Sequence, residues 1–473
     1  MAKHGVFVTE QPTSIGIPVT AASGVPFVIG TSPIQAAENP AKVGVPVLIY
    51  GWAEAKEKFG YAEDWTKYNL SEFMFAHFLL NNVQPVIFVN LLDPVTHKTA
   101  VAAADIAVVD HKVKIDFGAI NDATLIVKPE TGTGTAYVKG EDYDVLYDDT
   151  DCYVVLLVGG DAYAATKLNI ACNKVNPAAV DAAAVAAGME KIELCTTTLG
   201  MVPDLICAPG FSEDTAVAAV MAAKAAAING MFRAKALIDI PTDTGKAAAY
   251  SDVLTYKNAQ ALVDENQILC WPLLTFGGKT YHFSTLLAGL MASIDAENGA
   301  PYVSPSNKAI KCDGMVDAAG AEINLTLDQA NTLNAQGVVT ALNFMGGWKA
   351  WGNYTACYPG STDVKDMFIP VSRMFDWVAN TLIQTFWSRI DMPMNRRLVD
   401  SILDTGNIWL NGLVGSGYLL GARCVMLEDE NPLTSLMAGI IKLHVYITPP
   451  SPAQEIDFAL EYDAAYVEAA FAQ

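Results

Sequence analysis

The sequence predicts a multidomain protein of mixed α/β and α+β class: an α/β core with an inserted antiparallel β domain, a C-terminal domain of helices and sheet, and extended terminal arms. Three observations lead to this prediction. Buried-strand patterns alternate with helical stretches over residues 21–95 and 200–345. Short strand patterns are crowded together between residues 96 and 199. Two long amphipathic helices and alternating strands follow residue 346.

The chain is expected to begin with an arm, residues 1–20, rather than with part of a core. Turn-prone Pro12, Gly16 and Pro18 surround one short strand pattern at residues 6–9.

The middle α/β domain is expected to comprise residues 21–95 and 200–345. It begins with the strand patterns VPFVIG, VPVLIYG and QPVIFVNLL, and a polar helical stretch is predicted at 53–82. After residue 200 the alternation returns. Strands are predicted at 203–208, 234–240 and 267–275, and helices at 213–230 and 284–297.

Residues 96–199 are predicted to form the inserted domain, which we expect to be β-rich. Five short strand patterns lie close together between residues 111 and 158, namely KVKIDF, ATLIVK, TAYVKG, YDVLY and CYVVLLV. Two Ala-rich stretches around 162–187 are predicted to be helical and to lead back to the α/β domain.

The C-terminal domain, residues 346–448, is predicted from two helices. Pro370 suits a first helical position, and apolar residues then recur with helical spacing at 371, 374, 375, 378, 382 and 386. The second helix has apolar residues at 398, 402, 409 and 413, and Gly415 and Gly417 lie where it would end.

Strands are predicted at 418–427, 439–448 and 455–462, with a turn at Asn431-Pro432. The last strand belongs to a predicted C-terminal strand and arm, residues 449–473. Pro449, Pro450 and Pro452 are expected to keep the connection to it extended.

Composition limits the possible functions of this 473-residue chain. A net charge of −22 disfavours binding to nucleic acid, because a phosphate-binding surface needs positive charge. The eight cysteines contain no C-x-x-C pair, so neither zinc nor a disulfide framework is predicted. The Ala-rich run at 216–228 is short and carries Lys224, and no secretory core is found at the N-terminus, so neither export nor membrane insertion is expected.

No catalytic, cofactor-binding or metal-binding residue is predicted. Gly277-Gly278-Lys279-Thr280 follows a strand and precedes a helix, as a phosphate-binding loop does, but Leu273 occupies the position of the first required glycine. The six histidines lack H-E-x-x-H spacing. A P-loop-like nucleotide-binding enzyme, with Asp239 as a possible magnesium ligand, and a carbohydrate-binding module formed by the β domain remain as alternatives.

The arginines are unevenly distributed. The chain has six, and Arg389, Arg396 and Arg397 fall within nine residues at the junction of the two C-terminal helices. Arg389 could stabilise a helix C-terminus, but Arg396 and Arg397 lie near the start of the next helix, where the macrodipole does not favour them. This cluster is a candidate partner-binding patch.

Several segments resemble segments of one known protein family and follow the same order along the chain. They are HGVFVTEQP (4–12), PDLICAPGF (203–211), RAKALIDIP (233–241), PYVSPSN (301–307), LTLDQANTLNAQGV (325–338), WGNYT (351–355), VSRMFDWV (371–378) and GYLLGARCVMLEDEN (417–431). The family is that of the contractile tail sheath proteins of phages and of phage-tail-like bacteriocins. One departure is Tyr354, where family members often carry Arg.

The resemblance implies a non-enzymatic subunit that forms helical stacks of six-subunit rings around a tail tube. It also implies contacts with baseplate and tail terminator proteins, no cofactor, and a location in a virion tail or tail-like particle assembled in the bacterial cytoplasm. In that family the arms add strands to neighbouring subunits. The corresponding residues here are Val6, Phe7, Val8, Ile456, Phe458 and Leu460. The arginine cluster would face the tube.

Overall fold

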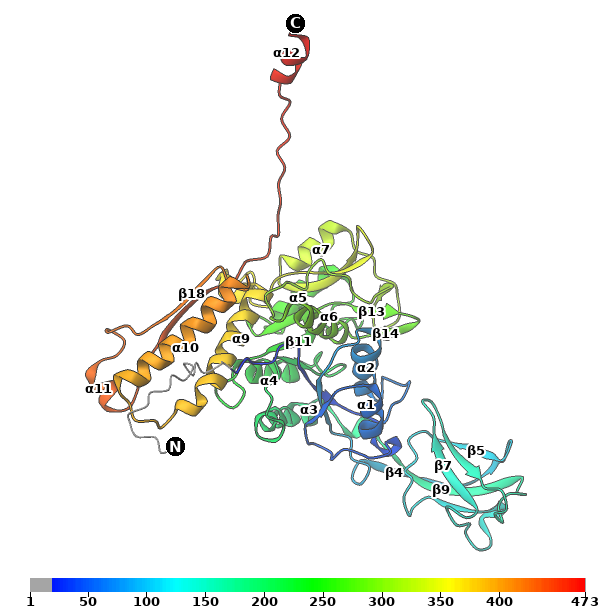
Figure 1. Cartoon of the computed structure of the whole chain (residues 1–473). Helices are drawn as coiled ribbons and strands as arrows, with labels where there is room; N and C mark the ends of the chain where they lie inside the picture. Colours follow the sequence, from blue (N-terminus) through cyan, green and yellow to red (C-terminus); the bar gives the residue numbers. More distant parts are fainter. Residues whose placement is uncertain (1–18, 473) are drawn as a thin grey trace, which may run out of the picture.

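The computed structural model describes residues 19–472. An α/β core lies in the middle of the molecule, the inserted β domain projects at one end, and the helical C-terminal domain lies at the other (Figure 1). The C-terminal segment leaves the folded body as an extended chain that ends in the short helix α12 (Ala465–Phe471). The predicted mixed α/β class is confirmed.

An eight-stranded sheet forms the core, in the order β17-β16-β12-β11-β10-β1-β3-β2. The six inner strands are parallel, and the two edge strands are antiparallel to their neighbours. Parallel strands covered on both faces are expected to be apolar throughout. The strands are β1 (Pro26–Gly30), β2 (Val47–Ile49), β3 (Val86–Asn90), β10 (Leu205–Cys207), β11 (Lys235–Asp239), β12 (Gln267–Cys270), β16 (Val338–Asn343) and β17 (Trp348–Trp351).

Helices cover both faces of this sheet, and each face has its own apolar core. One face carries α1 (Trp52–Phe59), α2 (Asn69–Met74), the π-helix η2 (Phe75–Leu80) and α6 (Phe283–Asn298). The other carries α3 (Ala182–Gly188), α4 (Thr215–Ala226), α5 (Tyr250–Ala259) and α7 (Leu327–Asn334).

Two predicted elements of the core are each divided in the structure. The helical stretch predicted at 53–82 is interrupted after α1 by Gly60, whose φ of +68° and close approach to the Pro33 carbonyl oxygen leave no room for a Cβ. The strand predicted at 267–275 is also divided. Pro272, which has no N–H for a sheet ladder, separates β12 from β13 (Leu273–Phe276).

The inserted domain contains two three-stranded antiparallel sheets, β4-β9-β6 and β5-β8-β7, around a separate core. The strands are β4 (Lys98–Ala107), β5 (Lys112–Ile115), β6 (Ile126–Pro129), β7 (Tyr143–Tyr147), β8 (Cys152–Leu156) and β9 (Lys167–Val175). Residues 167–175 were expected to be helical, and this prediction is wrong. Leu168, Ile170 and Cys172 alternate into the core, which is the period of a strand.

The boundary of the insertion also differs from the prediction. Val185 of α3, together with Met189 and Ile192 of the following 3-10 helix (Met189–Glu193), belongs to the core of the large sheet and not to that of the β domain. The inserted unit therefore ends with β9 rather than at residue 199.

The C-terminal domain contains both predicted helices, α9 (Ile369–Phe386) and α10 (Arg396–Gly415), after the short α8 (Val364–Met367). The strands β18 (Gly421–Val425) and β19 (His444–Thr448) are shorter than predicted and pair in antiparallel fashion. The turn predicted at Asn431-Pro432 is the start of a helix, α11 (Leu433–Met437), because Pro432 suits a helix N-terminus. Residues 455–462 form no strand within the described chain.

Candidate assembly surfaces

The glycine-rich segment that resembled a phosphate-binding loop is a β-turn. Gly277 and Gly278, both with positive φ, connect β13 to β14 (Lys279–Tyr281) in a two-residue hairpin. Lys279 forms an ion pair with Glu63, and its ammonium lies 4.6 Å from the Trp65 ring centre. The nucleotide-binding alternative is therefore wrong, since a phosphate loop must lead directly into a helix.

Asp239, considered as a magnesium ligand, is buried and satisfied by hydrogen bonds. Its carboxylate accepts from the hydroxyls of Ser212 and Ser284, and from the Ser284 amide at 2.9 Å in the first turn of α6. It therefore acts as a helix-capping acceptor. Within residues 19–472 no group of three or more potential ligands is arranged to hold a metal ion. No helix of that part of the chain is long and apolar enough to cross a membrane.

His282, beside this cap, is paired with an acid. Its Nδ1 lies 2.7 Å from Glu72 Oε2. Burial opposes protonation, but the neighbouring Glu72 carboxylate outweighs it and raises the pKa of His282 to about 10. A histidine held in the charged form is a poor general base, so this pair connects α2 to the start of α6 rather than providing catalysis.

A buried cluster of charges joins the C-terminal domain to the core, and the sequence analysis missed it. Arg373 of α9 donates to Asp295 of α6 at 3.0 Å and to Asp204 at 2.7 Å. Lys235 of β11 pairs with Asp376 of α9 at 2.9 Å. The one available signal was that the family-like segments at 203–211, 233–241 and 371–378 each carry a charge inside an apolar pattern.

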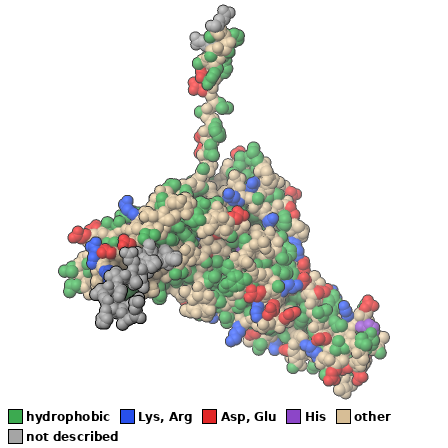
Figure 2. Space-filling model, in the orientation of Figure 1, with side chains coloured by type: hydrophobic (Ala, Val, Ile, Leu, Met, Phe, Trp, Pro, Cys, Tyr) green, Lys and Arg blue, Asp and Glu red, His purple; other side chains and the backbone are tan. Residues whose placement is uncertain are grey.

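The C-terminal arm is attached at its base and exposed beyond it. Tyr354 stacks on Tyr358 with ring centres 3.8 Å apart, and its hydroxyl donates to Gln454 Oε1 at 2.6 Å. Further along, Ile456 is 70% exposed, Phe458 85% and Leu460 97%. Figure 2 shows hydrophobic side chains along the projecting segment. Their pairing with another subunit, predicted from the sequence, stays a prediction.

The N-terminal arm residues Val6, Phe7 and Val8 lie outside the described residues. Residues 19 and 20 were expected to belong to this arm. Val19 instead lies against α9, where its amide donates to Thr385 Oγ1 at 3.1 Å. Val19 therefore already contacts the folded body of the protein.

The β18-β19 sheet has two strands. Asn407 of α10 covers the outer edge of β18, because its side chain donates to the Cys424 carbonyl oxygen and accepts from the Cys424 amide, both at 2.8 Å. The outer edge of β19 pairs with no strand in the described part of the chain. Cys424 and Val445 on the inner face of the sheet pack with α9 and α10. On the outer face, the Arg423 guanidinium lies 4.2 Å from the centre of the Tyr446 ring. Open edges of this kind can accept an additional strand from another chain.

The three clustered arginines lie at the far end of the C-terminal domain, where α9 and α10 meet; we call them the basic tip (Arg389, Arg396 and Arg397). Arg389 ends the 3-10 helix Trp387–Arg389, and Arg396 and Arg397 begin α10 after the connecting residues 390–395. Arg396 pairs with Asp400 at 2.8 Å, so part of its charge is compensated within the subunit. Trp387 in the same turn is 58% exposed, and such apolar residues are frequent at interfaces.

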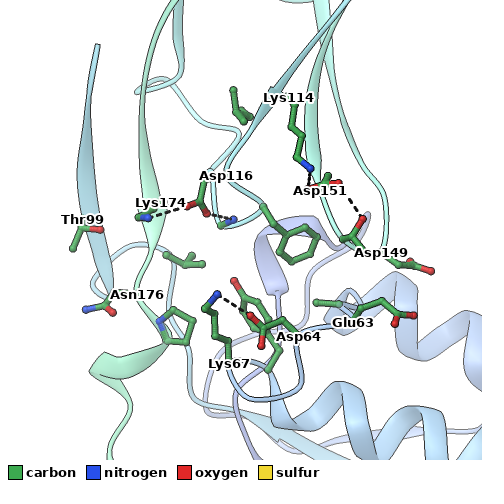
Figure 3. A pocket seen from close by; sticks show the side chains of 18 of the residues that line it. Glu63, Asp64, Lys67, Thr99, Lys114, Asp116, Asp149, Asp151, Lys174 and Asn176 are labelled. Atoms are coloured by element: carbon green, nitrogen blue, oxygen red, sulfur yellow. Dashed lines mark hydrogen bonds and ion pairs between the residues drawn. The ribbon is translucent and has the colours of Figure 1, made fainter. Parts of the chain in front are cut away.

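A cavity of about 890 Å³ lies where the inserted domain meets the core (Figure 3). Its lysines are all paired: Lys67 with Asp64 at 2.7 Å, Lys114 with Asp151 at 2.7 Å and Lys174 with Asp116 at 2.8 Å. Two contacts of Asp149 cross the junction, an ion pair with Lys56 at 2.7 Å and a hydrogen bond from the Glu63 amide at 2.8 Å. The cavity is thus a domain junction with no free cation among its lining lysines.

The known proteins that resemble this chain are tail sheath proteins. Residues 178–356 match the central domain of phage tail sheath proteins. The chain is 25% identical to the tail sheath protein of Burkholderia phage BcepMu over 98% of this chain and 97% of that protein. It is 27% identical to a putative prophage major tail sheath protein of Pseudomonas aeruginosa over 55% of this chain and 64% of that protein.

Solved sheath structures share the fold. The contracted sheath of the extracellular contractile injection system PVC has a TM-score of 0.60 at 15% identity, covering 98% of this chain and 99% of that chain. The sheath tail protein of Desulfitobacterium hafniense has a TM-score of 0.55 at 11% identity, covering 95% and 100%. The chain is therefore similar in sequence to phage tail sheath proteins along nearly its whole length, and it shares the fold of solved sheath proteins.

Proposed function

We propose that this protein is a tail sheath subunit that polymerises as stacked six-subunit rings around a tail tube and contracts to drive the tube through a bacterial envelope. Its relatives are structural sheath proteins and not enzymes. The observation that carries the proposal is the C-terminal arm. Ile456, Phe458 and Leu460 alternate along an extended segment and are 70–97% exposed, while the β18-β19 sheet of the same subunit has an open edge at β19.

An exchanged strand explains both features at once. Ordering about 15 residues of an arm costs on the order of 22 kcal/mol at about 1.5 kcal/mol per residue. Burying about 800 Å² returns about 20 kcal/mol at about 25 cal/mol per Å². Because the two free energies nearly cancel, the arm gains order only when a neighbour also provides main-chain hydrogen bonds.

In this proposal the C-terminal domain, residues 346–448, lies inside the sheath, and the inserted β domain lies outside. The basic tip then faces the tail tube, and the ends of the sheath contact the baseplate and the tail terminator. The subunit is made in the bacterial cytoplasm and functions in a virion tail or a tail-like particle. The segments that resemble the family, and the position of the tip at one end of the molecule, support this arrangement.

Negative-stain microscopy of the purified chain tests the proposal directly. The full chain should form long tubes, whereas variants that lack residues 1–18 or 450–473 should stay as dispersed subunits. Circular dichroism and thermal unfolding serve as controls, since both truncated subunits should fold like the full chain. Normal tubes from both truncations would exclude strand exchange.

A further inference from the structure

The first described residues of the chain are fixed along α9; we call residues 19–25 the arm base. Besides the bond from Val19 to Thr385, the Ala21 amide donates to Thr381 Oγ1 at 3.0 Å. The Trp377 indole N–H donates to the Ala21 carbonyl oxygen at 2.9 Å. Ala21 itself is 6% exposed and belongs to the core of the C-terminal domain.

The partners of the arm base on α9 occur at every fourth position, Trp377, Thr381 and Thr385, and Arg373 lies four residues before Trp377. Residues four apart lie on one face of a helix, and four residues advance it by about 6 Å. Two residues of extended chain advance by about 6.6 Å. The contacts at Val19 and Ala21 therefore stay in register with the helix, and the arm base runs antiparallel to it.

At the other end of this face, the arm base reaches the buried charge cluster. The amides of Gly24 and Val25 donate to Asp204 at 3.0 and 2.7 Å, and Asp204 accepts in turn from Arg373. The Arg373 side chain is 3% exposed, so these charged hydrogen bonds are protected from water. Gly24 has a φ of +69°, and a Cβ there would approach the Cα of Ala292 in α6 to 2.8 Å.

We infer that the arm base is an anchor that passes tension from the N-terminal arm into α9 and the Arg373 cluster, and that Thr381 and Thr385 position the arm. The inference rests on the proposed function, in which residues 1–18 reach a neighbouring subunit. The outermost contact of the arm base on α9 is at Thr385, one residue before the helix ends at Phe386. Each residue of the arm base that detached from α9 would lengthen the free arm by about 3.3 Å, and the neighbouring subunit would no longer be held in place.

The double variant Thr381→Val, Thr385→Val tests the anchor, because it removes both hydroxyls with little change in side-chain shape. Hydrogen exchange of the Val19 and Ala21 amides in the full chain should become about fivefold faster, as expected for loss of one ordinary hydrogen bond each. The purified variant should keep the wild-type circular dichroism spectrum but lose the ability to form long tubes.

Thr340→Val is the matched control, since the buried Thr340 hydroxyl has no hydrogen-bond partner in the described part of the chain. This control should change neither the hydrogen exchange of the Val19 and Ala21 amides nor the length of the tubes. Unchanged exchange in the double variant would refute the anchor, and faster exchange with tubes of normal length would refute its role in carrying tension. Absence of tubes from the wild type and the control as well would refute the proposed function, and the tension role with it.

Discussion

Individual residues in this protein act mainly by joining segments that are far apart in the sequence. Arg373 is the clearest case, because its partners Asp295 and Asp204 are 78 and 169 residues away. A buried ion pair adds little net stability compared with an apolar pair of similar shape, but loss of one partner leaves the other charge uncompensated. The cluster thus makes the joint between the core and the C-terminal domain specific.

Replacing Arg373 with Met should therefore destabilise the subunit by about 3–5 kcal/mol, because Asp204 and Asp295 would stay buried without a counter-charge. Urea unfolding followed by circular dichroism measures the effect. Arg397→Met, on an exposed arginine of the basic tip, should change the free energy of unfolding by less than about 0.5 kcal/mol. Equal effects of the two substitutions would show that the cluster has no structural role.

The pair of His282 and Glu72 makes the stability of the protein depend on pH. The pKa of His282 is about 10 in the folded protein and about 6.5 without its surroundings. The folded state therefore holds a proton that the unfolded state releases between these values. The stabilisation is complete below pH 6.5 and disappears as the pH rises toward 10.

Between pH 7 and pH 9, the wild type should lose on the order of 2 kcal/mol of unfolding free energy from this pair. His282→Gln should be less stable at pH 7 and should show a flatter profile over the same interval. Urea unfolding at several pH values gives both results. His111→Gln, at an exposed histidine of the inserted domain, should retain the wild-type slope. The same slope in His282→Gln would contradict the assignment.

At the scale of helices and strands, elements with a regular apolar period were predictable from the sequence, whereas the breaks within them were not. The apolar spacing of α9 and α10 and the buried strands of the core gave their positions correctly. Strand β9 was missed because its sequence, KLNIACNKV, contains lysine, leucine and alanine, which also suit helices, and the sheet around it decides the outcome. The partners of Arg373 could not be inferred, because they lie 78 and 169 residues away and apolar periodicity relates only residues that are close in sequence.

The hairpin at Gly277-Gly278 gives a further test at this scale. Because Lys279 belongs to a strand and pairs with Glu63, Lys279→Ala should change stability by less than about 1 kcal/mol and leave tube formation intact. Isothermal titration calorimetry should detect no binding of ATP with magnesium to the wild type. Micromolar affinity that disappeared in Lys279→Ala would restore the nucleotide-binding alternative.

Across the whole molecule, the surfaces proposed to contact partners are separated in space. The basic tip lies at one end, the inserted domain projects from the other, and the C-terminal arm leaves from the folded body between them (Figure 1). Exposed charge pairs contribute only about 0.5–1 kcal/mol each, and salt weakens them. Repetition around a ring multiplies that small contribution, so the tip can matter in an assembly even though it is weak in one subunit.

Replacing Arg389, Arg396 and Arg397 together by Gln should leave the subunit folded but favour contracted sheaths without a tube, especially at high salt. Microscopy of sheaths assembled with the tube protein over a range of salt concentrations measures this. The control variant replaces Lys98, Lys112 and Lys128 of the inserted domain by Gln, which removes the same charge elsewhere. Extended sheaths with unchanged salt sensitivity in the arginine variant would place the tube contact elsewhere.

All eight cysteines lie in the described part of the chain, and all are buried as free thiols. Burial raises the pKa of Cys152, Cys195 and Cys312 to about 12, and a thiol must ionise before it reacts. A new cysteine at Val158, which is 85% exposed in the inserted domain, would therefore be the accessible thiol of the native subunit. A maleimide dye placed there would allow fluorescence measurements of movement in assembled particles without removal of any native cysteine.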